Sequence, residues 1–167
     1  MQIRDFDPKQ GQAFQGDVSI IPIPADIAIA RNEEIKPIDN KLILQEGELT
    51  GHHHHIALRE KNFRPPTERG DPVLHVRDSK LHRAFGGGKR ETVMAGAKLY
   101  RDPAVAAEMQ QRGILTRADL AVGCLVVEGD AVTVAHQEHD GIRLPVGNYL
   151  IGRQIESAGE EEHRVAD

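Results

Sequence analysis

Histidine is the residue type best suited to chemistry in this sequence, and it is clustered. Nine histidines occur among 167 residues, and six of them fall in two short groups, His52–His55 and His136 with His139. Neutral imidazoles are common ligands for divalent transition metals such as Zn, Fe, Mn, Ni and Cu. The two groups therefore predict a transition-metal site, without indicating which metal it takes.

The first group lies in the strand-like segment 49–58. Because side chains alternate along a strand, His52 and His54 share one face. His53 and His55 share the other. The two members of each pair start about 7 Å apart at the backbone, so both can reach one ion. The alternation alone leaves open which pair faces the protein interior.

The second group closes another strand-like segment, because His136 ends it and His139 follows. If the two histidine segments are neighbouring strands, three or four imidazoles meet. Glu138 and Asp140 could then act as a carboxylate ligand or fix an imidazole tautomer. Were the site catalytic, Glu138 is the candidate general base, since a carboxylate beside a metal can accept a proton from water. The alternative is a solvated histidine run without a ligand.

The elements that must position these residues are mostly strands. β-branched runs bounded by glycine, proline and acidic turns predict strands at 18–24, 41–45, 49–58, 73–76, 122–127, 131–136 and 148–155. We expect 122–127 and 131–136 to pair as a hairpin. Residues 1–15 and 25–40 are expected to be irregular. The pattern indicates a mostly β fold, a small β-barrel or β-sandwich of which a cupin-like jelly roll is one form.

One helix is predicted over residues 103–112. Asp102 suits the N-cap, Pro103 the first turn and Gly113 the left-handed end. The helix falls within residues 59–119, whose charges, prolines and glycine run at 86–88 indicate an insertion. We therefore expect a single domain, 1–167, with a core formed by 15–58 and 120–156.

Composition limits the classes of partner. The net charge of −5 argues against a nucleic-acid partner, which requires a basic surface. No apolar run approaches the roughly 20 residues that span a bilayer, and the charged N-terminus shows no signal-peptide core. The only cysteine, Cys124, lies in an apolar run and is expected to be buried. These features predict a cytoplasmic protein.

Two resemblances add to this reading. His53-x-His55 followed by Glu60, and Pro145-x-Gly147, resemble the two motifs of the cupins. The resemblance implies a cupin-like barrel. The cupin ligand set is not reproduced, because Leu150 stands where the second motif has its histidine.

The second resemblance is to a family of short, uncharacterised bacterial and prophage proteins. Those proteins carry G-H-x-H-x-I, then H-E-E-H followed by L-P-x-G-x-Y and R-Q. The matching segments here are Gln15–Val18, Glu46–Ile56, His136–Tyr149, Arg153-Gln154 and Arg164–Asp167. Carried over by position, the resemblance favours His52 and His54 over His53 and His55, and adds His136 and His139. It implies no activity.

Two functions follow as hypotheses. The first is a metal-binding β domain with four ligands, His52, His54, His136 and His139; whether it is an enzyme, and on what substrate, is left open. The second is a structural or accessory component of a phage or mobile element, in a virion or its assembly, in which the histidines are structural. Either protein is expected to form a homo-oligomer or a larger assembly.

Overall fold

The fold is taken from a computed structural model that describes residues 2–46, 51–58, 60–62, 92–94, 96–158 and 161–164. The chain divides into two compact units, Met1–Leu58 with Gly96–Asp167, and Arg59–Ala95. In the second unit, strands β7 (Glu60–Asn62) and β8 (Thr92–Met94) pair antiparallel. The predicted strand at 73–76 and the glycine run at 86–88 lie outside the described residues.

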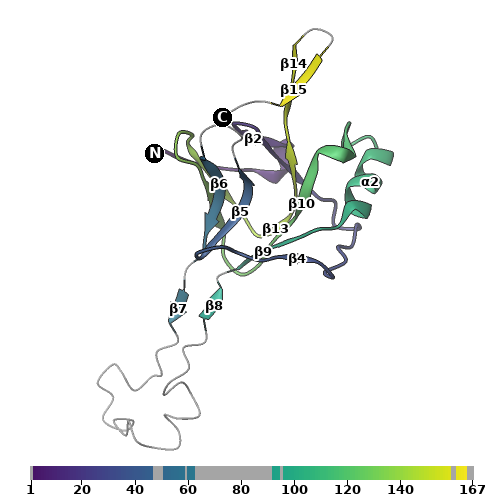
Figure 1. Ribbon diagram of the computed structural model, residues 1–167. Helices are drawn as coiled ribbons and strands as arrows, with labels where there is room; N and C mark the ends of the chain where they lie inside the picture. The colour runs from purple at the N-terminus through teal and green to yellow at the C-terminus, as the bar shows by residue number, and fades with distance from the viewer. Residues whose placement is uncertain are drawn as a thin grey trace, which may run out of the picture. The chain divides into compact units, whose positions relative to one another are not determined.

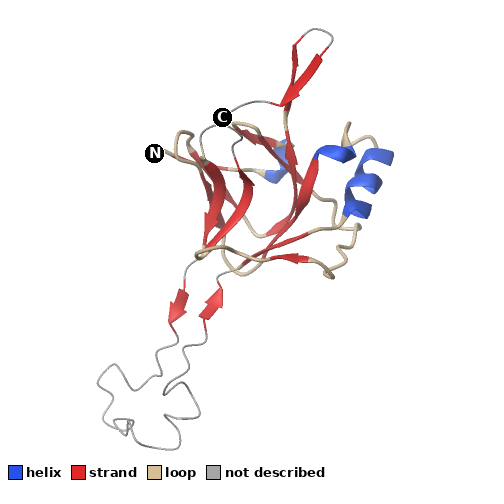
Figure 2. Cartoon of the chain, in the orientation of Figure 1, coloured by secondary structure: helices blue, strands red, loops and turns tan. Residues whose placement is uncertain are grey.

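The larger unit contains two main sheets (Figures 1 and 2). The five-stranded sheet has the order β1 (Ile3–Asp5), β12 (Gly141–Leu144), β11 (Val132–Ala135), β6 (His53–Ala57) and β5 (Lys41–Glu46). The six-stranded sheet has the order β2 (Ala13–Gln15), β3 (Val18–Pro22), β13 (Gly147–Arg153), β10 (Ala121–Val127), β9 (Ala97–Tyr100) and β4 (Glu34–Ile35).

The remaining elements of this unit are short. Strands β14 (Ile155–Ala158) and β15 (Glu161–Arg164) form a separate pair. Two 3₁₀ turns, η1 (Pro8–Gln10) and η3 (Ala118–Leu120), precede β2 and β10. The described residues contain one α-helix, α2 (Pro103–Gln111). No helix in this part of the chain is long and apolar enough to cross a membrane.

The main core lies between the two sheets. Tyr149 of β13 is 1% exposed, and its ring meets that of Phe6 edge-on with centroids 6.0 Å apart. Phe6 belongs to the five-stranded side, because its amide donates to the carbonyl of Arg143 in β12. One face of β13 therefore packs against the opposite sheet, which is the arrangement of a β-sandwich. The predicted mostly β class is confirmed, and the described strands form no closed barrel.

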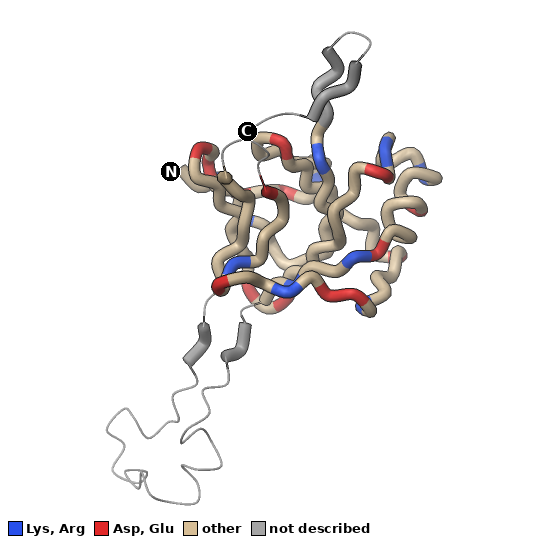
Figure 3. The backbone as a smooth tube through the Cα atoms, in the orientation of Figure 1, with Lys and Arg blue, Asp and Glu red and all other residues tan. Residues whose placement is uncertain are grey.

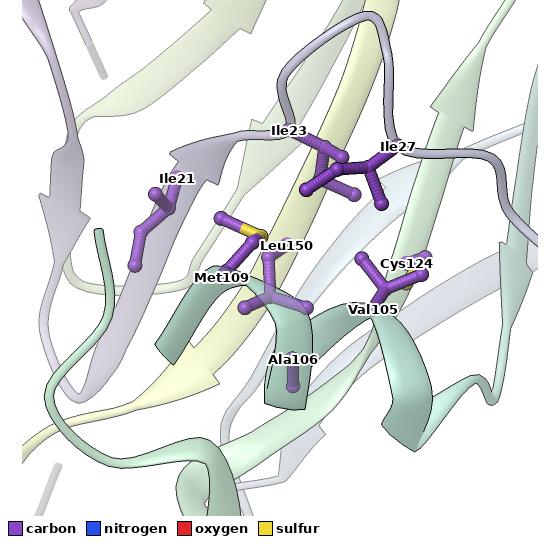
Figure 4. Close-up of a cluster of buried hydrophobic side chains, with 8 residues drawn as sticks. All are labelled: Ile21, Ile23, Ile27, Val105, Ala106, Met109, Cys124 and Leu150. Carbon is purple, nitrogen blue, oxygen red and sulfur yellow. The ribbon is translucent and has the colours of Figure 1, made fainter. Parts of the chain in front are cut away.

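The outer face of the six-stranded sheet is covered by α2. Leu150 and Cys124 point to this side and pack against Val105 and Met109 of the helix (Figure 4). The buried thiol of Cys124 is as predicted. The predicted helix is also confirmed: the Asp102 side chain accepts the amide of Ala104 at its start.

Several local predictions were wrong. Strands β10 and β11 do not form a hairpin, because β10 pairs with β9 and β13 while β11 pairs with β6 and β12. Both are apolar and β-branched, so their local pattern suits a crossover between sheets as well as a hairpin. Residues 1–15 contain β1 and β2, and 25–40 contain β4; these short strands are held by pairing rather than by local propensity.

The boundary of the predicted insertion also differs from the structure. Residues 96–119 belong to the larger unit, because β9 is a strand of the six-stranded sheet and α2 buries its apolar face there. Only 59–95 forms the other unit. The charged residues of the described part are mixed in sign, with Lys and Arg interspersed among Asp and Glu (Figure 3).

Candidate functional site

Strand pairing brings the two histidine groups together. Strand β6 lies antiparallel to β11, with His55 opposite Ala135 and Ile56 opposite Val134. His136 directly follows β11, so it lies beside the start of β6. His54 is fully buried at 0% exposure and His136 is 4% exposed. The proximity expected from the sequence is therefore present, in the interior of the larger unit.

A bulge in the neighbouring strand accompanies this placement. Along the β5–β6 pair the register shifts between Ile43 and Gln45, so that Gln45 is opposite His54 and Ile43 is opposite His55. A bulge increases local twist and changes the direction of nearby side chains. The irregularity lies beside His54, the buried histidine of the strand.

The inner imidazoles form a compact cluster. The ring of His136 stacks on that of His54, with centroids 4.3 Å apart and 25° between the planes. The ring of His136 also stacks on that of His139, with centroids 4.5 Å apart and 27° between the planes. His52 meets His136 edge-on at 5.8 Å. All four histidines that the sequence predicted as ligands thus lie in one cluster.

His53 and His55 lie apart from this cluster. Their ring centroids are 4.8 Å apart, on the face of β6 opposite to that of the buried His54. Burial lowers the pKa of His55 below its ordinary value, which favours the neutral form of this ring. The structure therefore answers the question left open by strand alternation: His54 faces the interior, and His53 and His55 do not join it.

Two residues from the opposite sheet hold His54. The Oδ1 atom of Asp17 lies 2.8 Å from Nε2, and the Oε1 atom of Gln15 lies 2.8 Å from Nδ1. Asp17 and Gln15 are 5% and 3% exposed. Both flank Gly16 in the turn between β2 and β3. The cluster is therefore built from both sheets and contains a buried carboxylate.

Glu138, the predicted general base, lies at the rim. Its side chain is 57% exposed, and its Oε1 atom is 3.5 Å from Nδ1 of His52, which is 30% exposed. Its backbone amide donates to Nδ1 of His136 over 3.1 Å. Asp140, the other predicted carboxylate, has a partner outside the cluster: its Oδ1 atom accepts the amide of Gln2 over 3.2 Å.

The arrangement is not a finished metal site. Among the described residues, no group of three or more His, Cys, Asp or Glu side chains is placed to hold one ion. Stacked rings lie in nearly parallel planes, whereas ligands must point at a common centre. Two ligands of a tetrahedral ion lie about 3.4 Å apart if each is about 2.1 Å from it, but His54 and Asp17 are at hydrogen-bond distance.

Gln15 and Asp17 were missed as site residues by the sequence reasoning. The available signal was a pair of polar residues around Gly16, directly before the mostly apolar strand β3. Both positions also fall within a segment that carries the second family resemblance. What could not be read was the pairing order that places this turn of one sheet against β6 of the other.

No family model, characterised protein or solved structure matches the chain. The two family resemblances therefore stay predictions.

Proposed function

We propose that this protein binds a divalent transition metal between β6 and the turn that follows β11. The ligands are drawn from His52, His54, His136 and His139, and Asp17 supplies a carboxylate. The observation that carries the proposal is the concentration of imidazoles beside a buried carboxylate: His54, His136 and Asp17 are each no more than 5% exposed.

A bound cation would replace the present partners of several of these buried polar groups. A polar side chain removed from water loses about 1–3 kcal/mol unless a partner replaces the lost hydrogen bonds. Imidazole nitrogens and a carboxylate oxygen together attract Zn, Fe, Mn, Ni or Cu ions. Such a cation would bind several of these groups at once.

Binding requires small rearrangements. The Nε2–Oδ1 separation of 2.8 Å between His54 and Asp17 must open by about 0.6 Å to accommodate an ion at the usual ligand distances. His136 must release the amide of Glu138 or bind through a rotated ring, because Nδ1 now accepts that hydrogen bond. His52 and His139 are partly exposed and can turn more freely.

A reaction is a further step in the proposal. An ion with one open position would be accessible from the side of His52 and Glu138, both of which reach solvent. On that side of the cluster, Glu138 is the residue that we propose as proton acceptor. The buried single cysteine is compatible with the reducing cytoplasm, which we propose as the location.

Metal content is the direct test. The protein is purified without an affinity tag or nickel resin and stripped with a chelator. It is then titrated with each of the five metal ions. The background is the double variant His53→Ala/His55→Ala, which removes the outer histidine pair and leaves the inner cluster intact. We expect this variant to take up about one ion per chain and to gain thermal stability with metal.

The inner residues supply the contrast. His139→Ala removes a partly exposed ring, so the fold is expected to survive, and the affinity should fall at least tenfold. If the double variant takes up no metal, or if uptake depends on His53 and His55 alone, the proposed function is wrong.

A second function is favoured by one observation, the stacking of rings that are already hydrogen-bonded. His54 contacts Gln15 and Asp17 through both nitrogens, and His136 contacts Glu138. Such a cluster can hold two sheets together without metal, as in the structural or virion-component hypothesis. In that case a chelator leaves the melting temperature unchanged, and light scattering shows a homo-oligomer or larger assembly.

A further inference from the structure

The side-chain amide of Gln15 can be oriented without ambiguity. Its Nε2 atom lies 2.7 Å from the carbonyl oxygen of Asp140 and 3.2 Å from that of Val134. Carbonyl oxygens only accept hydrogen bonds, so the NH₂ group must be on this side. The oxygen of the amide therefore faces His54, from which it is 2.8 Å distant.

The orientation of Gln15 determines where His54 carries its proton. An amide oxygen has no hydrogen to donate, so Nδ1 of His54 must be the donor of this contact. A neutral ring with its proton on Nδ1 has its lone pair on Nε2. Asp17 Oδ1 is the carboxylate oxygen beside that nitrogen, 2.8 Å away.

The contact between His54 and Asp17 then needs a positive charge within it. A lone pair and a carboxylate oxygen are both acceptors, and at 2.8 Å they repel unless a proton lies between them. A metal ion can replace that proton, because it too accepts electron pairs from both atoms. Nε2 and Oδ1 are thus the two atoms of this pair that an ion would bind.

We infer that Gln15 is the positioning residue of the site: it fixes His54 with its proton on Nδ1 and so makes Nε2, facing Asp17, the nitrogen that binds the ion. This inference rests on the proposed metal binding. Metal-ligating histidines commonly donate their other ring N–H to an oxygen that fixes the tautomer, and loss of that partner weakens binding about 10- to 100-fold.

Nuclear magnetic resonance of ¹⁵N-labelled histidine rings tests the first half of the inference in metal-free protein. We expect Nδ1 of His54 to carry a slowly exchanging proton. A ring with its proton on Nε2 alone overturns the inference, whether or not the protein binds metal. Adding ¹¹³Cd²⁺ tests the second half: scalar coupling is expected to Nε2 of His54, and coupling to Nδ1 contradicts it.

Variants separate positioning from folding. Gln15→Met is nearly isosteric and lacks the amide, so the tautomer of His54 should become mixed and Cd²⁺ binding about 10- to 100-fold weaker. The matched control is Gln154→Met, because that amide donates to the carbonyl of Gly16 in the same turn, whereas Gln15 bonds the ring of His54.

The outcomes are distinguishable. If Gln15→Met and Gln154→Met weaken Cd²⁺ binding equally, Gln15 is only structural and the inference is wrong. If Gln15→Met does not fold, the tautomer of His54 and its scalar coupling to ¹¹³Cd²⁺, both measured in the unmodified protein, still test the inference. If no sample binds Cd²⁺, Zn²⁺ or any other ion, the proposed function fails and the assignment of Nε2 as the metal-binding nitrogen fails with it.

Discussion

Replacing Asp17 by leucine should destabilise the protein, whereas asparagine should leave its stability nearly unchanged, and both changes should weaken metal binding. Asp17 is 5% exposed and lies against a histidine that is 0% exposed. Leucine has about the right size but no polar atom. It would leave Nε2 of His54 without this partner in the interior, at a cost of about 1–3 kcal/mol.

Asparagine should be tolerated much better. If the proton of His54 is on Nδ1, the amide NH₂ of the new asparagine can donate a hydrogen bond to Nε2. This bond takes the place of the proton that lies between Nε2 and the Asp17 carboxylate. We expect the free energy of unfolding of metal-free Asp17→Asn to stay within about 1 kcal/mol of the parent protein. Both variants lack the carboxylate ligand, so both should bind metal at least tenfold more weakly.

Urea unfolding followed by far-ultraviolet circular dichroism measures the stability difference, with a chelator present throughout. The chain has no tryptophan, so fluorescence would depend on its two tyrosines. For a chain of this size, 1 kcal/mol corresponds to roughly 2–4 °C in melting temperature. The reasoning is refuted if Asp17→Leu is as stable as the parent, or if Asp17→Asn is destabilised as much as Asp17→Leu.

Three further predictions concern the scaffold. Burial raises the pKa of Cys124 to about 12, so an alkylating reagent at mildly alkaline pH should label it only after unfolding, and rapid labelling of the native protein would contradict the packing. Burial also raises the pKa of Tyr149 to about 12 from an ordinary value near 10, so the stability this contributes is complete below about pH 10 and lost as pH rises toward 12. Ultraviolet titration of a Tyr100→Phe variant follows the ionisation of Tyr149 alone. Ionisation near pH 10 would contradict the prediction. Asp102→Ala removes the oxygens that accept the amides of Ala104, at 3.2 Å, and of Ala30, at 2.8 Å. This change should lower the free energy of unfolding, measured by denaturant titration, by about 1–2 kcal/mol. An unchanged midpoint would show that the cap contributes nothing.

The sequence predicted best what local pattern determines. The apolar run at β3 and the capped helix α2 were expected close to their observed bounds, because β-branched residues and a capping Asp102 act on their own neighbourhood. The alternation of side chains along β6 correctly separated His54 from His53 and His55. The mostly β class followed from these segments together.

Pairing between distant segments could not be predicted in the same way. The connection from β10 to β11 looks locally like a hairpin, and only the competing partners β9 and β6 show that it crosses between sheets. Strand β2 has little strand propensity and exists because it pairs with β3. For the same reason Gln15 and Asp17 were missed, since their importance depends on the opposite sheet.

Anomalous diffraction at the zinc absorption edge, from crystals of the His53→Ala/His55→Ala variant soaked in Zn²⁺, would test the central claim most directly. The account predicts one peak bonded to Nε2 of His54 and to Asp17 at about 2.0–2.2 Å, with a further imidazole from His52, His136 or His139. A crystal with no peak between β6 and the turn after β11, and with the rings still stacked, would contradict it.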